Sequence, residues 1–99
     1  MKIVKTDIEL KLALRYREKS ILVTNGLAEE IIDKFYTDDP TIYGAMSGAV
    51  LLTEPMMKLY FGSVDLFNCM MTIKSEYTLF LNEDKDQVIL TLREPDLTI

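Results

Sequence analysis

The chain contains few of the side chains that most often do chemistry in proteins. It has 99 residues, with no histidine and with Cys69 as its one cysteine. Imidazole is the commonest general base and metal ligand, and a thiolate is a common nucleophile. Cys69 lies in an apolar segment without a cationic neighbour in sequence, which predicts a buried and unreactive thiol. These residues indicate no catalytic site and no cofactor, and they favour a binding protein over an enzyme.

Carboxylates could still bind a divalent cation. The sequence Asn82-x-Asp84-x-Asp86 resembles the start of an EF-hand loop. However, the sixth position holds Gln87 where that loop needs glycine, and the twelfth holds Arg93 where it needs glutamate. We expect a polar hairpin loop here and not a calcium site.

A second acidic group surrounds Asp38 and Asp39, with Glu29, Glu30 and Asp33 nearby in sequence. Such carboxylates could collect Mg²⁺ and serve a small metal-dependent hydrolase. Glu29, Glu30 and Asp33 fall on the expected outer face of a helix, and Asp39 is placed to cap the next one. We therefore expect no metal site, and the carboxylate hydrolase is kept as an alternative function.

Basic residues are concentrated at the start of the chain. Residues 1–19 carry a net charge of +3 and the remainder −8, which gives the chain its net charge of −5. If this segment is a strand, Lys11, Arg15 and Arg17 share its outward face and form a basic stripe. The stripe is either a plain solvent-facing surface or a contact for an acidic partner or a second copy. Nucleic acid is not an expected partner, because the wider negative field would repel phosphate.

Gly44 and Gly48 lie four residues apart in an expected helix over 41–52, with Ala45 beside them. Residues at this spacing share a helix face, and small side chains let another backbone approach closely. We expect this face to pack tightly, either against the protein's own sheet or against a partner or second copy. A phosphate-binding turn is a further alternative, although no P-loop or G-x-G-x-x-G spacing is present.

The segment over 8–17 has two interpretations. Its apolar residues recur at every second position, which is typical of a half-buried strand. These residues are Ile8, Leu10, Leu12, Leu14 and Tyr16. The rival interpretation is a helix, because Thr6 to Glu9 fit a capping box. A helix would divide the apolar residues between two stripes, and it would stack Lys11, Arg15 and Lys19 at spacings where like charges repel. We therefore expect a strand.

The remaining patterns complete the expected fold. Helices are expected at 27–35, 41–52 and 56–61. Strands are expected at 8–17, 21–24, 64–73, 77–81 and 88–92, the last two joined as a hairpin. The predicted order is β-β-α-α-(α)-β-β-β in a single domain over residues 1–99. The predicted class is α+β, with the helices packed on one face of a largely antiparallel sheet of about five strands.

The sequence predicts function only as a class. An acidic α+β domain without catalytic motifs indicates a small protein-interaction module, a regulator, inhibitor or adaptor, acting alone or as a homodimer. An acidic inhibitor that imitates nucleic acid is a second alternative, beside the hydrolase. The longest apolar run, 42–52, is shorter than the roughly 20 residues that cross a bilayer, and the first residues lack the apolar run of a secretory signal. We therefore expect a cytoplasmic protein with no membrane contact.

Overall fold

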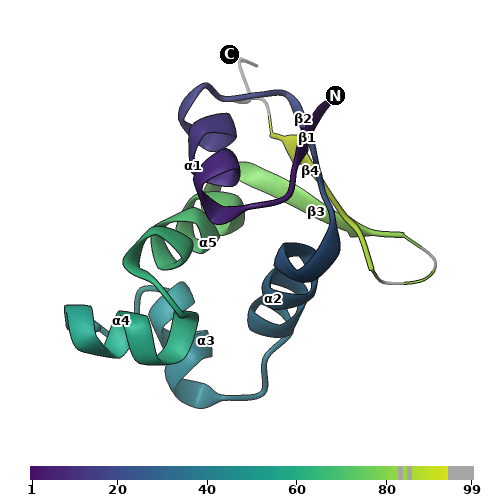
Figure 1. Cartoon of the computed structure of the whole chain (residues 1–99). Helices are drawn as coiled ribbons and strands as arrows, with labels where there is room; N and C mark the ends of the chain where they lie inside the picture. Colours follow the sequence, from purple (N-terminus) through teal and green to yellow (C-terminus); the bar gives the residue numbers. More distant parts are fainter. Residues whose placement is uncertain (83, 85, 94–99) are drawn as a thin grey trace, which may run out of the picture.

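Helices occupy two segments that the sequence pattern assigns to strands. The structure is a computed structural model that describes residues 1–82, 84 and 86–93. Figure 1 shows how its elements are arranged. Along the described residues they are β1 (Lys2–Val4), α1 (Asp7–Arg15), β2 (Ser20–Val23), α2 (Asn25–Phe35), α3 (Pro40–Met46), α4 (Glu54–Phe61), α5 (Val64–Glu76), β3 (Tyr77–Leu81) and β4 (Val88–Leu92).

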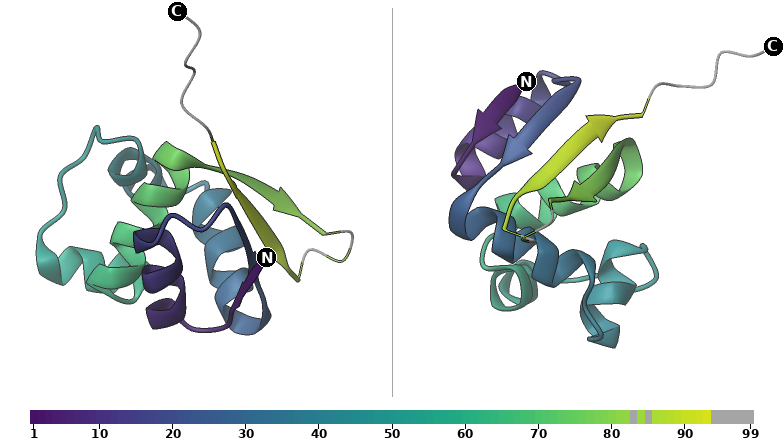
Figure 2. Two further views of the ribbon diagram at one scale, coloured as in Figure 1. Left: turned by 90° about the horizontal axis from the view of Figure 1, so that it is seen from above. Right: turned by 90° about the vertical axis from the view of Figure 1, so that its right-hand side faces the viewer.

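The four described strands form one mixed sheet in the order β1-β2-β4-β3. β1 and β2 are parallel and are joined through α1, whereas β2 pairs antiparallel with β4 and β4 pairs antiparallel with β3. The helices lie on one face of this sheet (Figure 2). The α+β class and the final hairpin are thus confirmed. The expectation of about five strands is not met in the described residues, and the β1–β2 pair departs from the antiparallel pattern.

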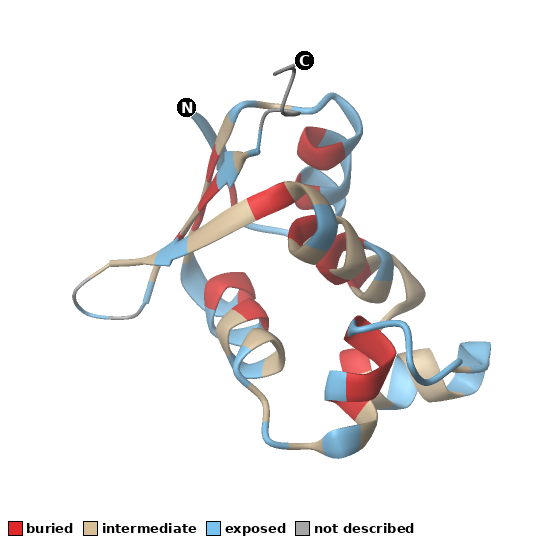
Figure 3. Ribbon diagram, turned by 180° about the vertical axis from the view of Figure 1, so that it is seen from behind, coloured by how far each residue is buried: buried red, intermediate tan, exposed pale blue. Residues whose placement is uncertain are grey.

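The core lies between the sheet and the helices. Buried positions recur at every second residue of β2 and β4, as the period of a half-buried strand requires. Figure 3 shows buried segments, in red, where helices and strands face one another. The residues with no exposed surface are Val4, Leu10, Ile21, Val23, Ala28, Ile31, Met70, Ile73, Val88 and Leu90. They come from three strands and three helices, so one apolar core joins both ends of the chain.

The expected strand over 8–17 is wrong, because this segment forms α1. Thr6 caps the helix: its Oγ1 accepts a hydrogen bond from the backbone N–H of Glu9 at 3.2 Å. The Glu9 carboxylate reaches back and accepts one from the backbone N–H of Lys5, also at 3.2 Å. These contacts satisfy backbone donors that a helix start leaves free. The capping box therefore decides the local structure over the alternating pattern.

The two apolar stripes that argued against a helix are both present on α1. Leu10 and Leu14 face the core and are buried. Ile8, Leu12 and Tyr16 lie on the other side, which is open to solvent, and we call these three residues the outer stripe. The apolar residues at every second position over 8–16 therefore belong to a helix that is apolar on two sides.

The expected strand over 64–73 is also wrong, because this segment forms the first ten residues of α5. Ser63 caps the helix, with its Oγ accepting a hydrogen bond from the N–H of Leu66 at 2.9 Å. The buried residues of α5 follow helical spacing, at positions 66, 69, 70 and 73. Phe67 and Met71 are partly buried as well. Apolar residues therefore occur at both odd and even positions of the segment, a pattern that is also typical of a strand covered on both faces. Asn68, at an apolar-looking position in sequence, lies on the exposed side of the helix.

The other helices match expectation in place, and α3 differs in length. Asp39 caps α3, accepting from the N–H of Thr41 at 2.8 Å, and Pro40 begins it. α3 ends at Met46 and not near 52, because Gly48 adopts a left-handed backbone with φ of 82°. α2, α4 and the strand β2 fall within a few residues of their expected bounds. Among the described residues, no helix has both the length and the apolar character needed to cross a membrane.

Candidate functional site

The three basic residues predicted as a contact surface lie along one groove. Lys11 and Arg15 are four residues apart on α1 and therefore share a side of the helix. Arg17 follows in the turn after α1, where its φ is 53°. The opposite wall of the groove is α5, and the groove has a volume of about 390 Å³. We call it the α1–α5 groove.

Acidic side chains of α5 neutralise much of this basic charge. Lys11 Nζ lies 3.1 Å from Asp65 Oδ1, and Arg17 Nη1 lies 2.7 Å from Glu76 Oε1. All four side chains are at least partly exposed, so each pair contributes at most about 1 kcal/mol. Arg15 has no ion pair among the described residues. Of the three basic residues that the sequence suggested as a contact, Arg15 is therefore the one whose charge no described acidic side chain neutralises.

Cys69 lies at the floor of the α1–α5 groove and is 3 % exposed. Burial raises the pKa of its thiol to about 11, and the nearby charge of Asp65 acts in the same direction. The thiol is therefore protonated near neutral pH, the form that is a poor nucleophile. The prediction of a buried thiol is confirmed.

Gly44 and Gly48 do not share a helix face, so that expectation is wrong. Gly44 and Ala45 are buried within α3, while Gly48 lies beyond the helix and is exposed, and a Cβ added there would meet no atom within 4 Å. A Cβ added at Gly44 would come within 2.6 Å of Cγ2 of Val50. Another part of the chain therefore does approach Gly44 closely, as expected. It is the turn after α3, which carries Val50. A contact of these residues with a partner or second copy stays a prediction.

The acidic residues weighed as metal ligands do not form a cluster. Among the described residues, no three histidine, cysteine, aspartate or glutamate side chains come together as a metal site would require. Asp39 is engaged in capping α3. In the β3–β4 loop, the Asn82 side-chain oxygen accepts hydrogen bonds from the N–H groups of Asp86 and Gln87, at 3.0 and 2.9 Å. These contacts fit a hairpin turn, as expected; positions 83 and 85 of this loop lie outside the described residues.

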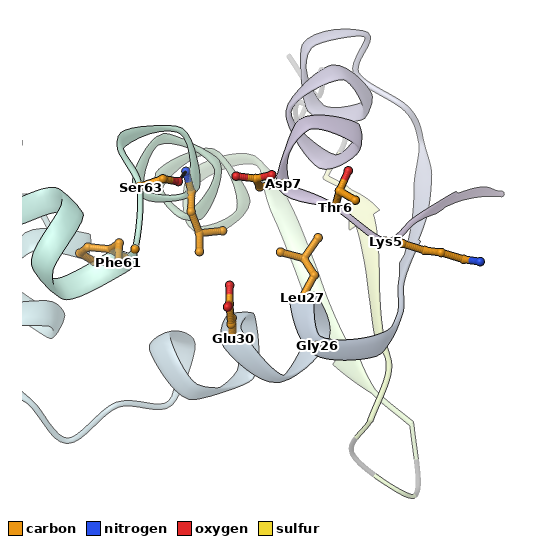
Figure 4. A pocket seen from close by; sticks show the side chains of 10 residues that line it. Lys5, Thr6, Asp7, Gly26, Leu27, Glu30, Phe61 and Ser63 are labelled. Atoms are coloured by element: carbon orange, nitrogen blue, oxygen red, sulfur yellow. Dashed lines mark hydrogen bonds between the residues drawn. The ribbon is translucent and has the colours of Figure 1, made fainter.

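A hollow of about 460 Å³ lies where α1, α2 and α5 begin. Asp7 and Glu30 lie on different sides of it, and Lys5 points away (Figure 4). Thr6 and Ser63 line this hollow, and their hydroxyls already accept hydrogen bonds as helix caps. Two carboxylates at the hollow oppose an anion. Side chains cap the starts of α1 and α5, whereas α2 has no side-chain cap. The hollow does not form a recognisable catalytic arrangement.

The surface feature that the sequence analysis missed is the outer stripe of α1. Ile8, Leu12 and Tyr16 are 64 %, 44 % and 74 % exposed. They are separated by four residues each, so they form one continuous line along the helix. Beside Leu12 and Tyr16 lies a hollow of about 170 Å³, walled on the far side by Lys2 of β1. The signal was present in sequence as the second of the two helical stripes.

In comparisons with known proteins, no protein family, curated protein or solved structure matches this chain. We therefore infer its function from its own structure.

Proposed function

We propose that this chain is a small protein-interaction module and that α1 is its binding element. The observation that carries the proposal is the exposure of the outer stripe. From their exposed fractions, Ile8, Leu12 and Tyr16 together offer on the order of 400 Å² of mostly apolar surface. The largest contiguous apolar patch on a typical monomeric protein is about 300–600 Å², and that patch is often functional.

The surroundings of the outer stripe resemble those of a binding surface. Charged residues flank it, with Glu9 on one side and Arg15 on the other. Interfaces commonly combine an apolar centre with a polar rim, and tyrosine and arginine are frequent among the residues that contribute most to binding. The small hollow beside Leu12 and Tyr16 offers a place for one side chain of a partner. These features support docking of a protein surface on α1.

The carboxylate hydrolase has less support. It needs Asp38, Asp39 and the acids of α2 to converge, and the described residues contain no such group of three. The larger hollow at the helix starts brings in only Asp7 and Glu30 as acids. Interaction through α1 is therefore the function that the geometry supports best.

Hydroxyl-radical footprinting of tyrosines tests this proposal. Isotope-labelled chain is oxidised in dilute buffer, at high concentration, and after addition to an extract of its native host. We expect Tyr16 to be protected in at least one of the last two conditions, because a docked partner covers its ring. Tyr36 and Tyr43 are matched controls, being 57 % and 62 % exposed and lying on other helices or their ends. Equal oxidation of Tyr16 in all three conditions would contradict the proposal.

A further inference from the structure

We infer that the surface that covers the outer stripe is the α1 helix of a second copy of this chain, docked antiparallel about a two-fold axis beside Leu12. This inference rests on the proposed function, since it names the partner of the same stripe. Three properties of α1 lead to it: the symmetry of the stripe, the distribution of charge along the helix, and the area that the stripe offers.

The outer stripe is symmetric about its central residue. A helix turns about 100° per residue, so Ile8 and Tyr16 lie about 40° to either side of Leu12 and one turn above and below it. In an antiparallel pair centred on Leu12, Leu12 meets its own equivalent and Ile8 lies level with Tyr16 of the second copy. A two-fold interface requires this kind of self-complementary patch. Tyr16 of the second copy then lies near the hollow beside Leu12.

The charge along α1 favours the antiparallel orientation. The helix carries Asp7 and Glu9 in its first turn and Arg15 in its last. In the antiparallel pair, Glu9 lies level with Arg15 of the second copy, on the opposite flank of the contact, whereas a parallel pair would place Glu9 level with its own equivalent. The antiparallel helix dipoles also attract one another. One oxygen of the Glu9 carboxylate is used in the helix cap, which leaves the other free to face the second copy.

The area indicates a weak dimer. A standard interface buries about 800 Å² per partner, and the outer stripe offers on the order of half of that. The flanking Glu9 and Arg15, with Lys2 at the hollow, extend the patch toward the size of a transient interface. The edge strand β1 contributes little, because it has three residues and carries a lysine, features that discourage strand addition. We expect a dissociation constant on the order of 10–100 μM.

Sedimentation velocity of the purified chain tests the inference, over a range from about 5 μM to about 1 mM. We expect the mass-average sedimentation coefficient to rise from that of one chain toward that of two. Leu12→Asp places two carboxylates against each other at the axis and should weaken the dimer by at least about tenfold. Leu51→Asp, at a residue 92 % exposed beyond α3, is the matched control and should leave the dimer unchanged. Circular dichroism of both variants should match that of the wild type, which checks that they stay folded.

A mixing experiment tests whether the partner of α1 is the α1 helix of a second copy and not another protein. In the Glu9→Arg variant, the new arginine lies level with Arg15 of the second copy. In the Arg15→Glu variant, the new glutamate lies level with Glu9 of the second copy. Like charges then face each other, so each variant alone should dimerise less than the wild type. An equimolar mixture places opposite charges at both levels and should recover at least the wild-type association. Variants that associate no better when mixed would overturn the contact between two α1 helices.

The outcomes separate this inference from the proposed function. A chain that stays monomeric to about 1 mM, with Tyr16 protected only in the native extract, would overturn the second copy and leave the interaction module standing. A monomeric chain with Tyr16 unprotected everywhere would contradict both. A dimer that survives Leu12→Asp but is lost with Leu51→Asp would place the contact elsewhere and overturn the inference.

Discussion

Alanine substitutions at Leu10 and Leu12 should have very different effects on stability, although the two residues are neighbours in one alternating pattern. Leu10 has no exposed surface, whereas Leu12 is 44 % exposed on the outer stripe. Truncating a fully buried leucine costs the transfer free energy of the lost methyl groups and leaves a cavity, about 3 kcal/mol in total. Leu12→Ala removes groups that are only partly buried and leaves no closed cavity, so we expect a loss of about 1 kcal/mol.

Urea unfolding followed by circular dichroism measures this difference, at about 1 μM so that self-association adds no stability. Leu14→Ala is an internal control that should match Leu10→Ala, because Leu14 is only 6 % exposed on the same side of α1. For a domain of this size, about 3 kcal/mol corresponds to a fall in Tm of roughly 15 °C, against roughly 5 °C for Leu12→Ala.

The result bears directly on whether α1 is a helix. In a strand, Leu10, Leu12 and Leu14 would point to the same side of the sheet and their truncation would cost similar amounts. Losses at Leu10 and Leu12 that agree within about 0.5 kcal/mol would therefore refute the helix and the reasoning built on its outer stripe.

Other substitutions and conditions test further features of the structure. Gly44→Ala should lower the free energy of unfolding by about 1–3 kcal/mol in urea, since its Cβ would meet Val50, and an unchanged midpoint would contradict that contact. Gly48→Ala meets no atom but adopts a left-handed backbone, so we expect a loss of about 1 kcal/mol by the same measurement. Stability should fall as pH rises from about 9 toward 11, because the Cys69 thiol ionises in the unfolded chain before it does in the folded one. Tm across that range should drop less for Cys69→Ala than for the wild type, and equal drops would argue against this cause. Tyr77→Phe removes a hydrogen bond of 2.9 Å that the ring hydroxyl donates to a backbone carbonyl, and it should cost about 1 kcal/mol in urea.

Helix caps, helical spacing and the polar hairpin loop correctly predicted the elements that depend on residues close together in sequence. Asp39 and Pro40 marked the start of α3, and the helical spacing of Leu27 and Ile31 identified α2. The β3–β4 hairpin was predictable because its two strands are close in sequence and a polar loop separates them. In each case, neighbouring residues hold the information that decides the structure.

At α1 the local capping signal was correct, but the charge repulsion weighed against a helix is offset by a contact that is distant in sequence. Lys11 repels Arg15 on α1, but Asp65, more than fifty residues away, offsets that repulsion. No local pattern could supply this partner or the pair between Arg17 and Glu76. The three basic residues do line one groove, but on a helix and its following turn and not on the strand face that was expected. Their neutralisation depends on α5 being a helix. That helix was obscured because its partly buried flanks are also apolar.

The strand order has a consequence for biosynthesis. β2 finds its antiparallel neighbour only in β4, where Val23 pairs with Val88. At about 5–20 residues per second, a ribosome adds the intervening chain in roughly 3 to 13 s. Throughout that interval the nascent β2 has only the three residues of β1 to pair with. Its inner edge is then accessible to a chaperone or to a neighbouring nascent chain, so translation speed over residues 24–92 should influence the yield of correctly folded protein.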